Sequence, residues 1–379
     1  MLLLMKNILF VIPEYSFGGT NKSLQNLINL LDTTKYKVYV YCLYEDGGDY
    51  YKNVFKEFIV KKGLFYYFLH DNVVTRKILG VYQRLNKNYQ FHWLYKHEAR
   101  RLEKKYNFDI VISYQELLST EFVSYFKVPK KIAWVQCDYP VLVGKSRYDE
   151  DLSYYQKYNT VVCVSNFATQ SMKLFYPQLS VNFAAIYNTL DIDYIRNKSK
   201  EGKSGFDKSM FNMVSVGRIT AVKGFKLIPA MVSKLKERVT KPFKWYIIGD
   251  GEDMGAMQTL IKSMKVEDYI VLLGYQDNPY PYIYDADLYV CTSESESFSY
   301  TIAESKVLHT PVLSNDFPVA FEVVTEKEGW IVNNSNMDSI LQKLIMNENL
   351  IYSKVKSFIQ NYTYNNSAIL NKIDKLFLE

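Results

Sequence analysis

The stretch "DLYVCTSESESFSYTIAESKVLHTPVLS", residues 287–314, indicates the fold class most clearly. Residues 287–293 form a mostly apolar run that is typical of a buried strand, and a polar loop follows. Residues 301–309 have helical character, and residues 310–314 indicate a second strand. A strand, a helix and a strand in this order predict a parallel sheet that helices cover on both faces.

The same alternation continues along the rest of the chain. Near-continuous apolar runs predict further strands at residues 6–13, 37–44, 109–114, 131–137, 161–165, 181–188, 210–219, 243–250 and 269–275. Apolar residues between these runs recur at helical spacing, as Leu24, Leu27, Ile28 and Leu31 do. We therefore expect an α/β protein with two doubly wound, Rossmann-like domains that leave a cleft.

A lysine-rich segment separates the two series of strands. Residues 196–209, "RNKSKEGKSGFDKS", include one aromatic residue and two glycines, a composition typical of a linker. A last helix follows both domains, with Ile369, Ile373, Leu376 and Phe377 on one face. The expected limits are 1–193 for the N-terminal domain, 194–209 for the linker, 210–361 for the C-terminal domain and 362–379 for the last helix.

The composition is ordinary for a folded soluble protein. The chain has 379 residues, of which 48% are hydrophobic and 23% charged, and its formal net charge is +6. The four cysteines lie far apart, which favours buried thiols in a reducing cytosol over a disulfide framework or a zinc site. The opening "MLLLMKNILFVIPEY" is interrupted by Lys6 and Asn7, unlike a signal peptide. No run approaches the roughly 18 apolar residues of a membrane span.

Two pairs of charged residues follow predicted strands of the second half, where open α/β sheets bind their ligands. Arg218 and Lys223 come after the run "MVSVG", and two cations at a strand end suit a phosphate or diphosphate. Glu296 stands in the loop after residue 293, and Glu304 stands one turn into the next helix. Glu304 can accept hydrogen bonds from a ribose, and Glu296 from a second polyol. Phosphate, ribose and sugar together describe a nucleotide sugar.

Glycines follow two other predicted strands. Gly18 and Gly19 let the backbone come close to a ligand just before a helix begins. Gly249 and Gly251 lack a third glycine at the offset of a dinucleotide fingerprint, and no acidic residue stands at the expected ribose position. The sequence therefore disfavours a dehydrogenase.

Several segments resemble a known family. "GRITAVKGF" at 217–225 and "ESFSYTIAE" at 296–304 are similar to the signature segments of the retaining GT-B glycosyltransferases of family 4, the glycosyl transferases group 1. Similar segments also occur at "GGT" 18–20, "IYNTLDIDYI" 186–195, "GDGED" 249–253, "GYQDNPYPYIYDADLYVCTSESESF" 274–298, "HTPVLSN" 309–315 and "EVVTEKEGWIV" 322–332. The resemblance implies a GT-B fold whose last helix crosses back to the N-terminal domain.

The resemblance also implies roles for residues of the second domain. Arg218 and Lys223 would bind the diphosphate and stabilise the leaving phosphate, and Glu296 would hold the donor sugar close to the reacting carbon. Glu304 would bind the ribose. Backbone N–H groups for sugar and phosphate would come from Phe298, Ser299, Tyr300 and Thr301, and Tyr275 and Gln276 lie where the family holds the base.

In the first domain the family pattern implies fewer roles. Gly19 would approach the phosphates, and Asn188 belongs to the crossover between the domains. "IAWVQCDY", 132–139, has Gln136 where many members have a histidine that could move a proton. We therefore expect Gln136 and Asp138 only to position the acceptor.

The expected activity is transfer of a hexose or N-acetylhexosamine from a nucleotide sugar, on family frequency a UDP-sugar, to a saccharide acceptor. The leaving phosphate would take the acceptor's proton, and neither a metal nor a further cofactor is required. A nucleotide-sugar epimerase or hydrolase on the same scaffold, and a non-catalytic nucleotide-sugar-binding subunit, remain the alternatives.

One basic segment indicates where the acceptor is. Residues 61–106 contain eleven lysines and arginines against three acidic residues, interleaved with ten aromatic residues. Such a segment can lie on an anionic bilayer, although a solvated helix pair with packed aromatics is the alternative. We expect a peripheral enzyme at the inner face of the cytoplasmic membrane that acts on a lipid-linked saccharide in capsule, exopolysaccharide or wall synthesis. No nucleic-acid motif accompanies the segment, and the sequence leaves the oligomeric state open.

Overall fold

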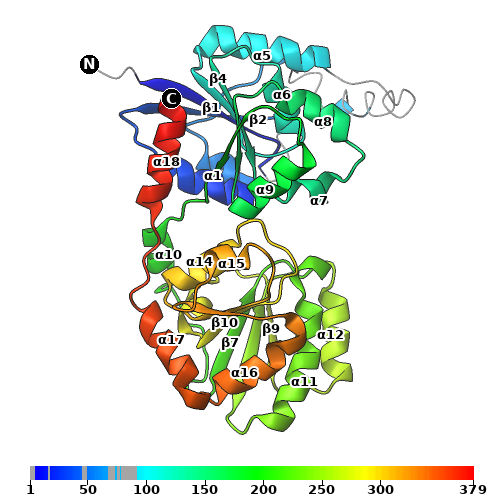
Figure 1. Cartoon of the computed structure of the whole chain (residues 1–379), viewed down its shortest axis with the longest axis vertical. Coiled ribbons are helices and arrows are strands. Elements are labelled where there is room, and N and C mark those ends of the chain that lie inside the picture. The colour runs from blue at the N-terminus through cyan, green and yellow to red at the C-terminus, as the bar shows by residue number, and fades with distance from the viewer. Residues whose placement is uncertain (1–4, 16–17, 45–48, 67–72, 75–76, 78–91) are drawn as a thin grey trace. The chain divides into compact units, whose positions relative to one another are not determined.

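The chain forms two compact units. A computed structural model describes residues 5–15, 18–44, 49–66, 73–74, 77 and 92–379 (Figure 1). Unit 1 consists of Met1–Thr189 together with Asn366–Glu379, and unit 2 is Leu190–Asn365. Each unit has its own parallel sheet and its own hydrophobic core, which confirms the α/β fold class predicted from the alternating pattern.

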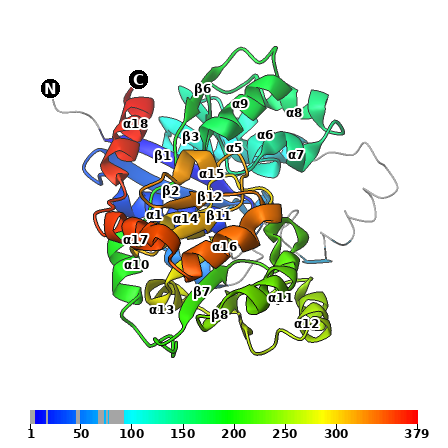
Figure 2. The same ribbon diagram turned by 60° about the horizontal axis from the view of Figure 1, so that its bottom comes forward.

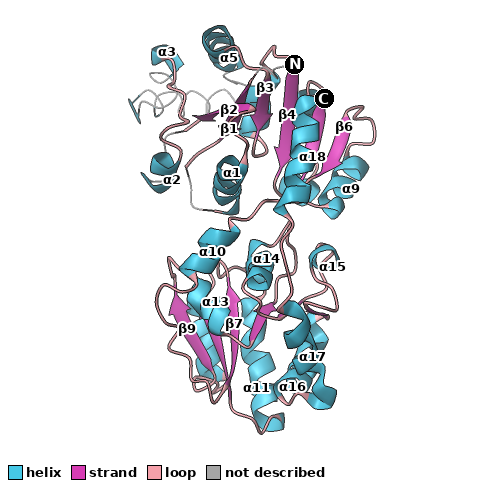
Figure 3. Cartoon of the chain, turned by 90° about the vertical axis from the view of Figure 1, so that its left-hand side faces the viewer, coloured by secondary structure: helices cyan, strands magenta, loops and turns pink. Residues whose placement is uncertain are grey.

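The sheet of unit 1 has six parallel strands in the order β2-β1-β3-β4-β5-β6. The strands are β1 Lys6–Ile12, β2 Tyr36–Cys42, β3 Ile110–Ser113, β4 Lys130–Val135, β5 Thr160–Cys163 and β6 Asn182–Ala185. Ile8 to Ile12 are fully buried, because helices cover both faces of the sheet (Figure 3). After β2 the chain returns to the other side of β1, so the switch in strand order lies between β1 and β3.

The helices of unit 1 connect its strands. They are α1 Gly19–Leu30, α2 Asp49–Val54, α3 Leu64–Tyr66, α5 His92–Tyr106, α6 Leu118–Ser124, α7 Tyr139–Val143, α8 Tyr148–Tyr155, α9 Asn166–Phe175 and α18 Asn366–Leu378. In α5 the apolar stripe of Leu94, Ala99 and Leu102 faces the core.

The C-terminal helix α18 belongs to unit 1, although it follows unit 2 in the chain (Figure 1). Ile369, Ile373 and Phe377 form a buried stripe at helical spacing. The ring centroid of Phe377 lies 5.5 Å from that of Tyr36. Lys35 Nζ lies 2.7 Å from Asp374 Oδ2, which fixes the helix beside the start of β2.

The sheet of unit 2 also has six parallel strands, in the order β12-β11-β10-β7-β8-β9. They are β7 Phe211–Val216, β8 Phe243–Ile248, β9 Ile270–Gly274, β10 Leu288–Cys291, β11 Val312–Ser314 and β12 Gly329–Ile331. After β9 the chain returns to the other side of β7. The switch in strand order therefore lies between β7 and β10, and in such sheets this is where ligands bind.

The helices of unit 2 lie on both faces of its sheet, and α16 packs against α11 (Figure 2). They are α10 Ile192–Lys198, α11 Ile228–Arg238, α12 Met254–Ser263, α13 Tyr280–Asp285, α14 Tyr300–Val307, α15 Ala320–Val323, α16 Met337–Ile345 and α17 Ile351–Ile359. The short 3-10 helices are η2 Ala221–Lys223, η3 Phe225–Leu227, η4 Asn334–Asn336 and η5 Glu348–Leu350.

The segment expected to be the linker, residues 194–209, lies within unit 2. Its first residues lie in α10, where Ile195 is buried. Further along, the Phe206 ring stacks on Tyr246 with the centroids 4.0 Å apart. Phe206 is therefore buried and packs this polar segment against the rest of unit 2.

Candidate functional site

The loops after β7 and β10 lie together at the carboxyl edge of the unit 2 sheet. Glu294 N donates to Val222 O over 2.8 Å, and Thr292 Oγ1 donates to Lys223 O over 2.8 Å. Gly224 has φ +67°, and a Cβ there would stand 2.2 Å from the Thr292 carbonyl oxygen. Because only glycine tolerates both this conformation and this approach, Gly224 allows the two loops to meet.

The expected catalytic residues Lys223 and Glu296 form an ion pair in this place. Lys223 Nζ lies 2.6 Å from Glu296 Oε1, and Ser293 Oγ donates to the same oxygen over 2.8 Å. The exposed fractions of the two charged side chains are 29% and 13%. Arg218 stands two residues after the end of β7 and is exposed, and among the described residues it makes no ion pair. The edge therefore presents one paired and one unpaired cation.

Helix α14 begins at the same edge, immediately after the loop that carries Glu296. Ser299 precedes it in the left-handed conformation, with φ 62° and ψ 77°, and is buried. Its hydroxyl has no hydrogen-bond partner in the part of the chain that the structure describes. Thr301 is fixed to the strand β10 by its Oγ1, 2.6 Å from Tyr289 Oη. The first N–H groups of α14 carry the partial positive charge of a helix N-terminus.

Glu304 lies on α14 and is only 2% exposed. Tyr280 Oη, at the start of α13, donates to Glu304 Oε1 over 3.3 Å. The rings of Phe298 and Tyr300 pack edge to face, with centroids 5.0 Å apart. The two glutamates thus differ in their environment. Glu296 forms an ion pair with a lysine, whereas Glu304 is buried and accepts a hydrogen bond from a tyrosine.

Tyr275 and Gln276 follow β9 and lie two strands away from β7. Tyr275 is 64% exposed, and Gln276 Nε2 donates to Leu273 O over 2.9 Å within its own turn. They share the carboxyl edge of the sheet with the charged cluster.

In unit 1 the glycines follow β1 and Gln136 follows β4, two strands of the sheet that are separated by β3. Gly18 precedes α1 in an extended conformation, Gly19 begins the helix, and a Cβ on Gly18 would meet no atom within 4 Å. Gln136 follows β4, and its Oε1 accepts a hydrogen bond from Asn188 Nδ2 over 3.3 Å. Asp138 precedes α7 and accepts from Ser171 Oγ over 2.8 Å.

Asn188 is part of a buried polar chain that sequence reasoning missed. Its Oδ1 accepts from Ser23 Oγ over 2.7 Å, and Ser23 Oγ lies 2.7 Å from Tyr114 Oη. Glu116 was also missed, and its carboxylate accepts the backbone N–H groups of Gln136 and Cys137. The only indication of Glu116 in the sequence was its position as an acidic residue just after a predicted strand.

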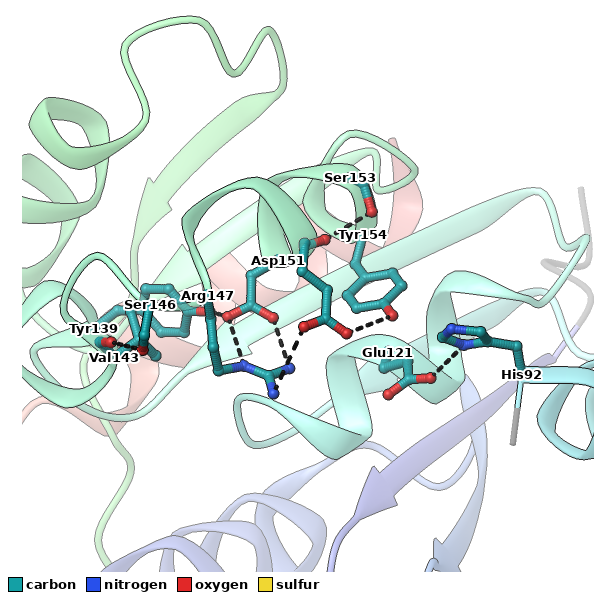
Figure 4. A network of polar contacts seen from close by, with 10 residues as sticks. His92, Glu121, Tyr139, Val143, Ser146, Arg147, Asp151, Ser153 and Tyr154 are labelled. Carbon is teal, nitrogen blue, oxygen red and sulfur yellow. Dashed lines mark hydrogen bonds and ion pairs between the residues drawn. The ribbon is translucent and has the colours of Figure 1, made fainter. Parts of the chain in front are cut away.

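A second polar network connects the helices of unit 1 (Figure 4). Arg147 binds Asp151 at 2.9 Å, and Tyr139 donates to the same carboxylate over 2.5 Å. His92 Nδ1 lies 2.8 Å from Glu121 Oε1, which joins α5 to α6. Burial raises the pKa of the Glu121 carboxyl, and the attraction of His92 partly offsets this. These contacts fix α5 to α6 and α7 to α8.

The sequence contains two Asp-X-Asp triplets, at 191–193 and 285–287, and an aspartate of each has a structural partner. Asp191 accepts the N–H of Tyr194 at the start of α10, and Asp285 binds Lys208 over 2.9 Å. No group of three or more histidine, cysteine, aspartate or glutamate side chains that could hold a metal ion occurs among the described residues. In the same residues no helix is long and apolar enough to span a membrane.

Residues 67–72, 75–76 and 78–91 of the expected membrane segment 61–106 lie outside the described residues. Within the described part, the side chains of Tyr66 and Tyr95 are buried in the core, whereas Trp93 is 46% exposed on α5. Lys96 Nζ lies 5.4 Å from the centroid of the Tyr125 ring. The aromatics of this segment therefore divide between the core and the surface.

Residues 197–361, which carry the charged cluster, match the model of the family described as Glycosyl transferases group 1. This part of the chain is a glycosyl transferases group 1 domain. The resemblance expected from Arg218, Lys223, Glu296 and Glu304 is thereby confirmed for the family.

A curated relative is similar over part of its length. The chain is 30% identical over 161 residues to an N-acetylgalactosamine-N,N'-diacetylbacillosaminyl-diphospho-undecaprenol 4-alpha-N-acetylgalactosaminyltransferase of Campylobacter jejuni, which is 42% of each protein. The chain spans about two fifths of the length of the first curated relatives that it matches.

Solved structures resemble the whole chain in fold. The lipopolysaccharide outer core galactosyltransferase WaaB gives a TM-score of 0.69 at 15% identity, over 98% of this chain and 99% of WaaB. Anabaena HepE in complex with UDP and glucose gives 0.74 at 13% identity, over 98% and 99% of the two chains. The chain therefore has the GT-B fold, as expected from the sequence.

Proposed function

We propose that the protein is a glycosyltransferase that moves a hexose or N-acetylhexosamine from a nucleotide sugar to a saccharide acceptor. One observation carries the proposal: Lys223 and Glu296 meet, beside the exposed Arg218, at the switch in strand order of a glycosyl transferases group 1 domain. Cations, a carboxylate and the N-terminus of α14 together match the phosphate and sugar of one donor molecule.

The diphosphate is assigned to Arg218, Lys223 and the first N–H groups of α14. A lysine ammonium has three N–H donors, and Glu296 takes one of them, so two remain for phosphate oxygens. Arg218 adds a planar group with a fixed pair of donors for the same oxygens. Backbone N–H groups of residues 298–301 complete the site.

The sugar and the ribose are assigned to different glutamates. Lys223 and Ser293 both donate to Oε1 of Glu296, which leaves Oε2 for hydroxyl groups of the donor sugar. Glu304, on α14, is assigned to the vicinal hydroxyls of the ribose. Tyr275 and Gln276, after β9, are assigned to the base, which we propose is uracil because the fold neighbour HepE binds UDP.

The transfer that we propose retains the configuration at the anomeric carbon. Glu296 is engaged by Lys223 and Ser293 and is not assigned as a nucleophile. The bond from the anomeric carbon to the diphosphate oxygen breaks while the acceptor oxygen bonds to the same face. The proton of the acceptor hydroxyl passes to the leaving diphosphate oxygen, so no metal or protein base is required. Arg218 and Lys223 stabilise the charge that develops on the leaving group.

The acceptor is assigned to unit 1, near Gln136, Asp138 and Asn188, and we propose that it is lipid-linked. The Campylobacter relative is named for a diphospho-undecaprenol acceptor, and WaaB for lipopolysaccharide core synthesis. The basic segment 61–106 would hold the enzyme on the inner face of the cytoplasmic membrane in the synthesis of a bacterial surface polysaccharide such as a capsule, an exopolysaccharide or a wall glycan.

A screen of nucleotide sugars tests the proposal. Thermal shift with UDP, GDP, ADP and CMP should show stabilisation by UDP, because a ligand that binds only the folded state raises its stability. Turnover of UDP-hexoses and UDP-N-acetylhexosamines is then measured with and without octyl glycosides as acceptors. Release of UDP that depends on acceptor supports transfer. Release of free sugar or of an epimer at the same rate without acceptor would instead indicate a hydrolase or an epimerase.

A further inference from the structure

Glu116 is a buried carboxylate at the switch in strand order of unit 1. It follows β3 by three residues, and its exposed fraction is 6%. Carboxylates are rarely buried to this degree without a partner, because removing a charge from water is costly. The burial of Glu116 therefore requires hydrogen-bond partners for its carboxylate, and the sequence alone does not show which groups these are.

The partners of Glu116 are two consecutive backbone N–H groups. Its Oε1 accepts from Cys137 N over 2.9 Å and also from Gln136 N. Both donors stand directly after β4, the strand that pairs with β3 through Ile112 and Ile132. Glu116 thus fixes the backbone where β4 ends and α7 has not yet begun.

No ion pair explains the burial of Glu116. Among the described residues, no lysine, arginine or histidine lies within ion-pair distance of it. The titratable groups that face it are Cys137 after β4, Cys163 of β5 and Tyr155 of α8, and burial raises the pKa of each. Glu116 is instead held by the backbone N–H groups of Gln136 and Cys137 and by the Cys137 thiol.

The side chain of Gln136 is held as well as its backbone. Asn188 donates to its Oε1, and Asn188 is in turn fixed by Ser23 of α1. Asp138, at the end of the same loop, is fixed by Ser171 of α9. Residues 136–138 are therefore held at three consecutive positions, with Glu116 supplying the backbone anchor.

We propose that Glu116 is a positioning residue that sets residues 136–138 for the acceptor substrate. The proposal rests on the proposed function in so far as the acceptor lies at Gln136 and Asp138. Glu116 makes hydrogen bonds with backbone N–H groups. The reach of its side chain, that is its length, rather than its charge therefore fixes residues 136–138. Loss of that reach weakens acceptor binding and leaves the nucleotide site of unit 2 intact.

Two conservative variants separate reach from charge. Glu116→Asp keeps the charge but is one methylene shorter and cannot reach both N–H groups. Glu116→Gln loses the charge but keeps a carbonyl oxygen at the same distance. Glu98→Asp is the matched control, since Glu98 is also a buried carboxylate of unit 1, where it binds Arg101 and the N–H of Gly63.

The first measurement is amide hydrogen exchange in the free protein, which does not depend on activity. We expect Glu116→Asp to speed exchange at Gln136 and Cys137 by about tenfold or more, with Glu116→Gln and Glu98→Asp close to wild type there. Unchanged exchange in Glu116→Asp, or faster exchange in Glu116→Gln alone, would overturn the proposal.

The second measurement is steady-state kinetics with UDP-sugar and an octyl glycoside. Glu116→Asp should raise the acceptor KM by about tenfold with little change in UDP affinity, and Glu116→Gln should restore it. A fall in thermal stability without this change in KM would assign Glu116 a structural role only. If the wild type transfers to no acceptor, the proposed function fails, whereas the exchange result still decides whether Glu116 holds the loop.

Discussion

Lys223 Nζ and Glu296 Oε1 are 2.6 Å apart, so the lysine and the glutamate expected to share a donor already neutralise one another. Their partial burial makes this interaction stronger than that of an exposed pair. A diphosphate that enters must therefore compete with Glu296 for Lys223, whereas the unpaired Arg218 can bind it without rearrangement.

Removal of either cation should slow transfer. We expect Arg218→Ala and Lys223→Ala each to lower kcat by ~100-fold or more at saturating donor, because each removes one group that stabilises charge on the leaving phosphate, roughly 3 kcal/mol. Lys226→Ala is the control, since Lys226 pairs with Asp253 at 2.7 Å. Near-normal turnover in both site variants would contradict the assignment of the diphosphate.

The two glutamates should differ in their effect on free UDP. Glu304→Ala should weaken UDP binding by ~10-fold, because a hydroxyl bound to a carboxylate contributes roughly 1.5 kcal/mol or more. Glu296→Ala should keep or tighten UDP binding, since Lys223 is then released, but should damage turnover. Calorimetry with UDP separates the two, and equal losses of affinity would count against this division of roles.

Gly224 should be intolerant of any side chain. Gly224→Ala places a Cβ at φ +67° and 2.2 Å from the Thr292 oxygen, and should lower the free energy of unfolding by about 2 kcal/mol or more. Gly255→Ala in α12 is the matched control, because a Cβ there meets no atom within 4 Å, and it should be neutral or stabilising by about 0.5–1 kcal/mol. Urea unfolding measures both, and equal effects would show that the contact with Thr292 is not limiting.

Lys306 should make stability depend on alkaline pH. Burial lowers the pKa of Lys306 from 10.5 to about 8, although Glu328 Oε2 lies 4.0 Å away. Above about pH 8 the folded state releases the proton while the unfolded chain still binds it, so stability rises with pH up to about 10.5, by at most about 3 kcal/mol.

The test compares the wild type with Lys306→Met by denaturant unfolding from pH 7 to 10. The variant should be relatively most stable at pH 7, and the wild type should gain on it as the pH rises. Lys375→Met, at an exposed position of α18, is the control and should show a constant difference from the wild type. If the difference in stability between Lys306→Met and the wild type is the same at every pH, the lowered pKa of Lys306 is contradicted.

The membrane proposal predicts binding that depends on lipid charge. Sedimentation with vesicles should show binding to anionic lipid, weak binding to neutral lipid, and release by added salt, because salt screens the lysines and arginines of residues 61–106. Trp93→Ala, at an exposed aromatic of α5, should weaken binding, and Tyr50→Ala, at an exposed aromatic of α2, is the control. No binding at low salt would leave a transferase without a membrane partner.

The sequence predicted the sheets better than the contacts between loops. Every expected strand is present, because buried parallel strands are continuous apolar runs. The strand β12 was missed because three residues, Gly329–Ile331, are too few to form such a run. Phe206 was assigned to a linker because its neighbours are polar, and only the fold brings it to Tyr246.

The charged residues of the candidate site were found, but their pairing was not. Lys223 and Glu296 are far apart in sequence, and the order of β7 and β10 brings them together. Glu116 was not singled out, because a carboxylate after a strand is usually a surface residue, and its partners are backbone groups that any sequence would have. The left-handed Ser299 was likewise beyond prediction, since serine has no preference for that conformation.

The place of α18 has a consequence for the synthesis of the protein. Unit 1 is closed by a helix that the ribosome makes only after all of unit 2, whose residues are contiguous in the chain. Unit 2 can therefore fold while it emerges, whereas Tyr36 and Lys35 of unit 1 must wait for Phe377 and Asp374. Synthesis of unit 1 therefore starts before that of unit 2 and ends after it. Unit 1 reaches its final stability only once α18 has been translated.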